Sequence, residues 1–237
     1  ESILELFSGI DSRFVKDTNP QRRDNLAAYI RKIEEYGPEG WIVPDKEVMQ
    51  ELEDADVLFV NISAVTDAML RKANRLRAIF LLRSGFEGIN IKSASELGIS
   101  VSNCPSRLAE PVADMTIALM LSECRGIVRG NLRSTNGIWK QLDDYDDRSN
   151  ATLGSLTIGL VGYGGIARAV ARRLINGFGA QVIAFDPYVS LEQMQIDGVA
   201  RVETLDELLK KSDIVSVHMR VSEETKGMFG EREFSLM

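Results

Sequence analysis

The sequence predicts an α/β protein built from two domains, each with a parallel sheet. Short apolar runs rich in β-branched residues alternate with segments of helical periodicity, which is typical of a parallel sheet covered by helices. A glycine-rich turn joins one such run to a helix in the second half of the chain. With 237 residues, the chain is long enough for two modest domains. We predict a flavodoxin-like domain over residues 1–104 and an incomplete Rossmann domain, a doubly wound parallel sheet, over residues 105–237.

Repeated strand and helix patterns define the first domain. A first helix is expected from residue 26, where apolar residues recur at helical spacing until Gly37 and Pro38 end the pattern. Gly98 stands where a helix C-cap is expected. Strands are expected at 56–62, 78–82 and 99–102, and helices at 66–74 and 91–97. The pattern does not give the order of the strands in the sheet.

A long helix at 110–125 is expected to join the domains, because apolar residues give it a broad apolar face. That predicted face comprises Val112, Met115, Ile117, Ala118, Met120 and Leu121. The polar segment after it contains an acidic run at 143–147, which is typical of a solvated loop. The second domain should then follow with strands at 157–161, 181–185 and 214–218 and helices at 165–175 and 205–211.

Composition excludes several classes of protein. A formal charge of −7 opposes binding to a phosphate backbone, so nucleic acid is not an expected partner. No apolar stretch approaches the roughly 20 residues of a membrane span. One histidine and two cysteines, without clustering, argue against a metal site and favour a reducing cytoplasm. The chain begins without Met and stops at Met237 inside a helical pattern, so both ends are expected to be cut.

The glycine-rich turn carries the strongest functional signal. Gly162, Gly164 and Ala167 form a GxGxxA pattern directly after an apolar strand and before a helix. In this pattern the first glycine permits a tight turn, the second lets a pyrophosphate approach the backbone, and the third small residue lets the helix pack closely. The N-terminus of the helix then offers N–H groups to the phosphates. The turn therefore predicts a dinucleotide site.

An acidic residue supports the same site. Asp186 follows about 24 residues after Gly162, at the end of the next strand, where an acid can bind the hydroxyls of the adenosine ribose. Its carboxylate would repel a 2′-phosphate, so NAD is favoured over NADP. The alternative is that Asp186 and Pro187 only terminate a strand.

Taken together, these motifs resemble the D-isomer-specific 2-hydroxyacid dehydrogenases over nearly the whole chain. The matching stretches are 83–85, 98–99, 112–114, 154–166, 184–188, 212–218 and 224–228. The resemblance implies hydride transfer between NAD and C2 of a D-2-hydroxy acid or its 2-oxo acid. It also implies a homodimer built around the long helix.

The resemblance assigns roles to particular residues. Around the cofactor, Gly165 and Ile166 would contact the pyrophosphate, and Asp186 with Pro187 the adenosine ribose. His218 and Met219 would lie on the adenosine side, and Cys104 and Val112 would approach the cofactor from the domain junction. The backbone of Ser84 and Gly85 would receive the substrate carboxylate, with Arg83 either a further anion contact or a solvated side chain.

His218, the only histidine, is not expected to be the proton-transfer group, because in the family the catalytic histidine comes later. The family's catalytic arginine, glutamate and histidine all follow the position of Met237, so no catalytic residue is predicted in this chain and the segment is expected to be inactive. Glu87, Leu108 and Arg220 depart from the family pattern and leave the substrate open. Two alternatives remain: an NAD-sensing protein like the corepressors that resemble this family, and a pseudoenzyme.

Overall fold

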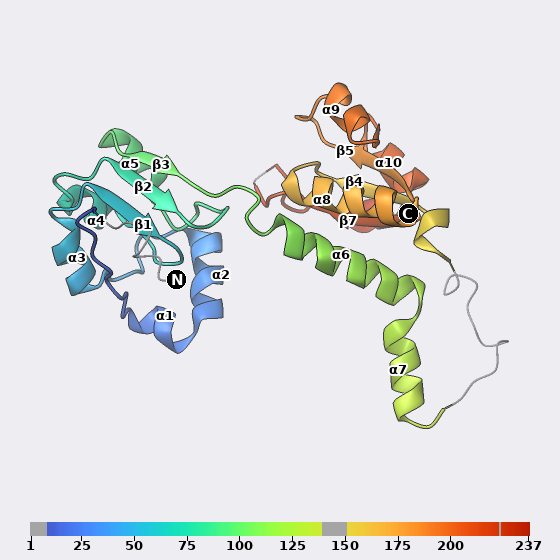
Figure 1. Ribbon diagram of the computed structural model, residues 1–237, viewed down its shortest axis with the longest axis horizontal. Coiled ribbons are helices and arrows are strands. Elements are labelled where there is room, and N and C mark those ends of the chain that lie inside the picture. Colours follow the sequence, from blue (N-terminus) through green and yellow to red (C-terminus); the bar gives the residue numbers. More distant parts are fainter. Residues whose placement is uncertain (1–8, 139–150, 223) are drawn as a thin grey trace. The chain divides into compact units, whose positions relative to one another are not determined.

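The computed structural model describes residues 9–138, 151–222 and 224–237, and the acidic run 143–147 lies outside them. The chain divides into two compact units, Glu1–Arg107 (unit 1) and Leu108–Met237 (unit 2). Each unit contains one sheet, and every strand pair in both sheets is parallel (Figure 1).

The sheet of unit 1 has its strands in consecutive order. They are β1 (Val57–Val60), β2 (Ala78–Leu81) and β3 (Ser100–Ser102), with β2 in the middle. The helices of unit 1 are α1 (Pro20–Asp24), α2 (Leu26–Tyr36), α3 (Lys46–Leu52), α4 (Asp67–Lys72) and α5 (Ile91–Glu96). Consecutive order is also that of the last three strands of a flavodoxin-like sheet.

Helices α3, α4 and α5 contribute to the core on one face of this sheet. Ile79 and Leu81 of β2 are buried there with Leu70 of α4 and Ala94 of α5. The helix starts are fixed locally: the side chains of Thr66 and Asn90 accept hydrogen bonds from the first turns of α4 and α5. As predicted, Gly98 ends the second of these helices, with a φ of +68°.

The strands of the unit 2 sheet are arranged in the order β6-β5-β4-β7. All of them are parallel, and it is the progression of the strand numbers that changes direction at β4. Its strands are β4 (Thr157–Val161), β5 (Gln181–Phe185), β6 (Ala200–Arg201) and β7 (Ile214–Val217). The chain starts in the middle, runs to one edge and returns to the other side of β4. This is the 3-2-1-4 order of a Rossmann fold, and ligands bind where the order reverses.

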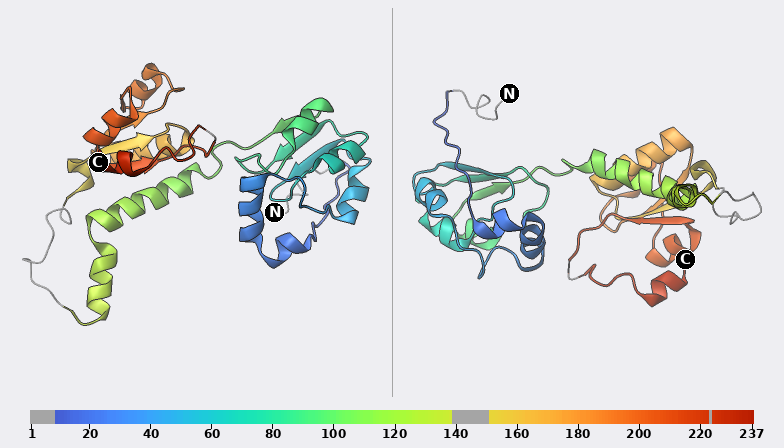
Figure 2. Two further views of the ribbon diagram at one scale, coloured as in Figure 1. Left: turned by 180° about the vertical axis from the view of Figure 1, so that it is seen from behind. Right: turned by 90° about the horizontal axis from the view of Figure 1, so that it is seen from below.

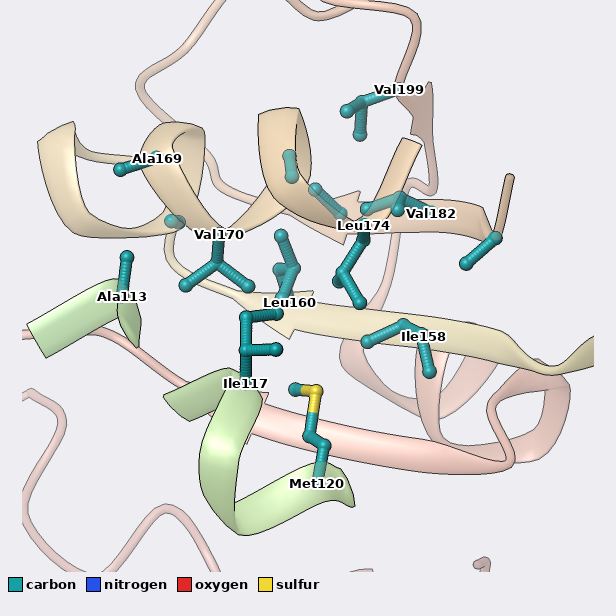
Figure 3. Packing of buried hydrophobic residues seen from close by; sticks show 14 of the residues in the cluster. Ala113, Ile117, Met120, Ile158, Leu160, Ala169, Val170, Leu174, Val182 and Val199 are labelled. Atoms are coloured by element: carbon teal, nitrogen blue, oxygen red, sulfur yellow. The ribbon is translucent and has the colours of Figure 1, made fainter. Parts of the chain in front are cut away.

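Helices cover both faces of the second sheet. Its helices are α6 (Ala109–Cys124), α7 (Ile127–Thr135), α8 (Gly165–Arg173), α9 (Leu191–Ile196), α10 (Leu205–Lys211) and α11 (Glu231–Ser235). A 3-10 turn (Leu153–Ser155) precedes β4, and a π-helical turn (Leu174–Phe178) continues α8. Side chains of α6 and α8 pack on one face, whereas those of α10 pack on the other. Figure 3 shows Ile117 and Met120 of α6 pointing toward β4.

Several details differ from the sequence predictions. Val112, Met115 and Ala118 were predicted on the apolar face of α6, but all three are exposed, Val112 by 37% and Met115 by 60%. The helix is apolar on more than one side, so its pattern could not select a face; the buried residues are Ala109, Ala113, Ile117, Met120 and Cys124. Helices α1, α3, α7 and α9 and strand β6 were not predicted. The last helix ends at Ser235, so Met237 does not lie within it. Helix α7 buries no residue and turns away from α6 (Figure 2).

Candidate functional site

The turn between β4 and α8 is held tightly against the end of β7. Gly162 has a φ of +86°, which favours glycine, and its N–H donates to the carbonyl of Phe185 at 2.8 Å. A Cβ at this position would lie 2.8 Å from Cγ of Met219 and 3.1 Å from the carbonyl carbon of His218. Gly162 therefore serves both the turn and the close approach of two strand ends, which the sequence pattern predicted only in part.

The start of α8 is open to a ligand. Gly164 is the N-cap, with ordinary extended dihedral angles, and a Cβ on it would meet nothing within 4 Å. No side chain of the described residues caps this helix, although the first N–H groups of a helix lack partners inside it. Gly165 and Ile166 are its first residues, and Ala167 is fully buried against the core. This arrangement suits an anion at the helix N-terminus.

Asp186 stands beside the same turn, at the carboxyl end of β5. One carboxylate oxygen accepts from the N–H of Tyr163 at 2.7 Å, and the other accepts from the N–H groups of Tyr188 at 2.8 Å and Val189 at 3.1 Å. The adjoining Pro187 follows the strand and donates no backbone hydrogen bond. The acid is thus fixed in position next to the glycine turn, as a ribose-binding acid must be.

Tyr163 is a member of the site that the sequence did not reveal. Its side chain is fully buried, and its hydroxyl donates to Asp197 at 3.1 Å. The guanidinium of Arg168, in the first turns of α8, lies 5.7 Å from the ring centroid and 4.0 Å from Asp197. Burial and the charge of Asp197 raise the pKa of Tyr163, so its hydroxyl stays protonated. Because 34 positions separate the two residues, no local sequence signal could have found this contact.

His218 follows β7, and its N–H donates to the carbonyl of Val161 at 2.8 Å. Nε2 of the ring lies 2.9 Å from the hydroxyl of Ser216, and Met219 comes next beside Gly162. Burial lowers the pKa of His218 below its ordinary value. The ring is therefore neutral near pH 7 and has a hydroxyl, rather than a carboxylate, as its neighbour.

The lowered pKa of His218 predicts acid sensitivity of unit 2. The unfolded chain binds a proton at the ordinary histidine pKa of about 6.5, whereas the folded chain binds it only at lower pH. The contribution of the histidine to stability is therefore complete above pH of about 6.5 and is lost as the pH falls below it. We expect His218→Gln to reduce the fall in the free energy of unfolding between pH 7.5 and 5.5, measured by urea denaturation. An unchanged pH dependence in the variant would contradict this assignment.

In unit 1, the loop after β2 is fixed by the segment that follows β3. The N–H of Cys104 donates to the carbonyl of Arg83 at 3.0 Å, and the hydroxyl of Ser84 donates to the carbonyl of Cys104 at 3.0 Å. Asn103 Nδ2 donates to the carbonyl of Ser84 at 2.5 Å. Arg83 Nη2 lies 3.6 Å from Glu34 Oε1. The structure thus brings Arg83, Ser84 and Cys104 together in unit 1, next to Gly85.

Three remaining positions lie at element ends or on the surface. Val112 is in the first turn of α6, in unit 2. Leu108 is the N-cap of that helix and makes no capping hydrogen bond, whereas asparagine is a favoured residue at helix N-caps. Arg220 is exposed, and its carbonyl accepts from the hydroxyl of Thr225 at 2.7 Å.

The described residues contain neither a metal-ligand cluster nor a membrane-spanning helix. No group of three or more histidine, cysteine or acidic side chains could hold a metal ion. No helix is both long and apolar enough to cross a bilayer.

Comparison with known proteins assigns the family. Residues 117–237, just over half of the chain, match the family model described as "D-isomer specific 2-hydroxyacid dehydrogenase, NAD binding domain". The chain belongs to this family. The resemblance inferred from the motifs is thereby confirmed, as are the α/β class, the Rossmann fold of the second unit and NAD as the cofactor that it binds.

Individual members of the dehydrogenase family match both units. The D-3-phosphoglycerate dehydrogenase of Methanocaldococcus jannaschii is 31% identical over 193 residues, covering 81% of this chain and 36% of that protein. The glyoxylate reductase of Korarchaeum cryptofilum is 31% identical over 193 residues, covering 81% and 58%. The D-lactate dehydrogenase of Aquifex aeolicus, complexed with NAD and lactic acid, matches with a TM-score of 0.66 and 31% identity over 80% of this chain and 55% of that chain. The chain thus spans between about a third and three-fifths of these relatives.

Proposed function

We propose that this chain supplies the cofactor site and the substrate-carboxylate site of an NAD-dependent D-2-hydroxyacid dehydrogenase. The observation that carries the proposal is the open, uncapped start of α8 next to Asp186, at the point where the strand order of a Rossmann sheet reverses. Relatives named for glyoxylate, hydroxypyruvate and lactate support a small 2-hydroxy or 2-oxo acid as the substrate.

The predicted site residues of unit 2 each have a binding role in this proposal. The N–H groups of Gly165 and Ile166 bind the pyrophosphate, because they lie in the first turn of α8, which no side chain of the described residues caps. Asp186 binds the adenosine ribose with Pro187 beside it, and His218 and Met219 line the adenosine side of the site. When bound, NAD accepts or donates the hydride, while the protein aligns it with C2 of the substrate.

The substrate-carboxylate site lies in unit 1. The backbone of Ser84 and Gly85 receives the carboxylate, and Arg83 adds a planar guanidinium that suits an anion. The hydrogen bonds from Asn103 and Cys104 hold this loop in one conformation. Cys104 of unit 1 and Val112 of unit 2 are each proposed to contact the cofactor.

We also propose a homodimer and a cytoplasmic location. Exposed apolar side chains on α6 and α7 support the dimer, because surfaces of this kind are usually covered by a partner. They are Met115, Leu119, Ile127, Val128 and Leu132. Both cysteines, Cys104 and Cys124, are free thiols, which fits a reducing compartment.

Substitution of Asp186 tests the cofactor site. We expect the wild-type chain to bind NAD at least about tenfold more tightly than NADP, because the carboxylate opposes a 2′-phosphate. Asp186→Ala should narrow this ratio. Asp186→Asn should also narrow it while retaining an oxygen for the N–H groups of Tyr188 and Val189. Fluorescence quenching gives the two dissociation constants.

Asp213→Asn is the matched control, because Asp213 accepts from the N–H of Thr157 at the opposite end of β4. This variant should keep the wild-type ratio. A wild-type chain that prefers NADP would contradict the assignment of Asp186.

A further inference from the structure

The carboxylate of Glu87 lies against the backbone of the proposed carboxylate-binding loop. A Cβ built on Gly85 would overlap Oε2 of Glu87 and would lie 3.0 Å from its Cδ and 3.1 Å from its Oε1. The acid therefore folds back into the space that the missing side chain of Gly85 leaves. Among the described residues, no hydrogen bond or ion pair joins Glu87 to another group, so its charge is available to a ligand.

The surrounding loop holds this acid close to the place where a substrate would bind. The carbonyl of Leu82 accepts from Nη1 of Arg107 at 2.6 Å, and the carbonyls of Arg83 and Ser84 accept from the segment after β3. The carbonyls of the three residues before Gly85 therefore all accept hydrogen bonds, which fix the backbone that leads into Gly85. Glu87 is only two positions further along, so its charge stays at the loop wherever its side chain turns.

The charges around the loop are of both signs. Arg83 and Arg107 are its cations, and Arg83 is already 3.6 Å from Glu34. Glu87 adds a carboxylate without a cationic partner among the described residues, directly beside Gly85. A second negative charge on the substrate meets repulsion from Glu87, whereas a cation on the substrate side chain can pair with it.

We propose that Glu87 is a specificity-determining residue that makes the loop select 2-oxo acids with a positively charged side chain and reject those with a second carboxylate or a phosphate. This inference rests on the proposed function, since it takes the loop at 83–85 as the site of the substrate carboxylate. The arginines attract the C1 carboxylate of the substrate, and Glu87 pairs with the cation of its side chain.

Three 2-oxo acids of similar length serve as probes: 2-oxo-5-guanidinopentanoate is cationic, 2-oxoglutarate is a dicarboxylate, and 2-oxohexanoate has a neutral side chain. Their affinities are measured by calorimetry on the full-length protein that carries this sequence, with saturating NAD, and their turnover is measured with NADH. We expect the wild type to bind the guanidino acid at least tenfold more tightly than 2-oxoglutarate. The ratio should fall to within threefold in Glu87→Gln and should invert in Glu87→Lys.

Glu96→Gln is the matched control, because Glu96 is an exposed acid of the same unit on α5 and pairs with Arg71. It should keep the wild-type ratio. A ratio that survives in Glu87→Gln, or a wild type that binds 2-oxoglutarate as tightly as the guanidino acid, overturns the inference. Failure of the proposed function gives a different result, namely no oxidation of NADH with any of the three acids, including the neutral one.

Discussion

Replacing Gly164 with valine is expected to abolish NAD binding, raising the dissociation constant at least 100-fold, while unit 2 stays folded. The new side chain would meet no protein atom within 4 Å of its Cβ, and a φ of −83° with a ψ of −165° is allowed for valine. The valine side chain would therefore occupy only the open space in which we propose that the pyrophosphate binds. A branched side chain there would hold the pyrophosphate away from the N–H groups of α8, which lose their short hydrogen bonds to it.

Two further glycine variants separate binding from folding. Gly130→Val, in α7, also meets nothing within 4 Å and should leave NAD binding unchanged. Gly162→Val should unfold unit 2, because its φ is +86° and its Cβ would lie 3.1 Å from the backbone of Met219. Calorimetry with NAD and the unfolding temperature of each variant test these expectations. Normal NAD binding by Gly164→Val would show that the glycine turn is not the pyrophosphate site.

Most elements of the fold could be predicted because their signals are local. The apolar runs that became β4, β5 and β7 are four or five residues long, and the glycine turn and the caps mark where helices begin and end. Strand β6 has only two residues, too few for any periodicity. The order β6-β5-β4-β7 was also beyond the sequence, since pairing joins strands that are distant along the chain.

The candidate site also contains features that the sequence could predict and features that depend on tertiary packing. Gly162, Gly164 and Asp186 were predictable, because a tight turn, an open helix start and an acid at a strand end each demand a particular residue type at a fixed spacing. The contact between Tyr163 and Asp197 could not be predicted, because it depends on how α9 packs beside the glycine turn. The position of Glu87 against Gly85 likewise depends on the path of an irregular loop.

We expect the 237-residue chain to show no dehydrogenase turnover, at least about 10⁴-fold below the full-length protein, even when it is folded and binds NAD. Proton transfer by a positioned group contributes about 10²–10⁴-fold to a rate, and orientation of the substrate contributes more. His218 is the only histidine of the chain. Its ring lies beside the hydroxyl of Ser216, and burial lowers its pKa.

A histidine in this setting is a poor proton donor for a substrate oxygen. It is mostly neutral near pH 7, and no carboxylate among the described residues is hydrogen-bonded to its ring to stabilise a proton on it. The purified segment should be assayed with NADH and a panel of 2-oxo acids, beside the full-length protein and a His218→Ala variant of each. The variant should leave the full-length rate within about tenfold of wild type, since we propose that His218 lines the cofactor site and transfers no proton. Robust turnover by the 237-residue chain that disappears in His218→Ala would instead make His218 the catalytic acid.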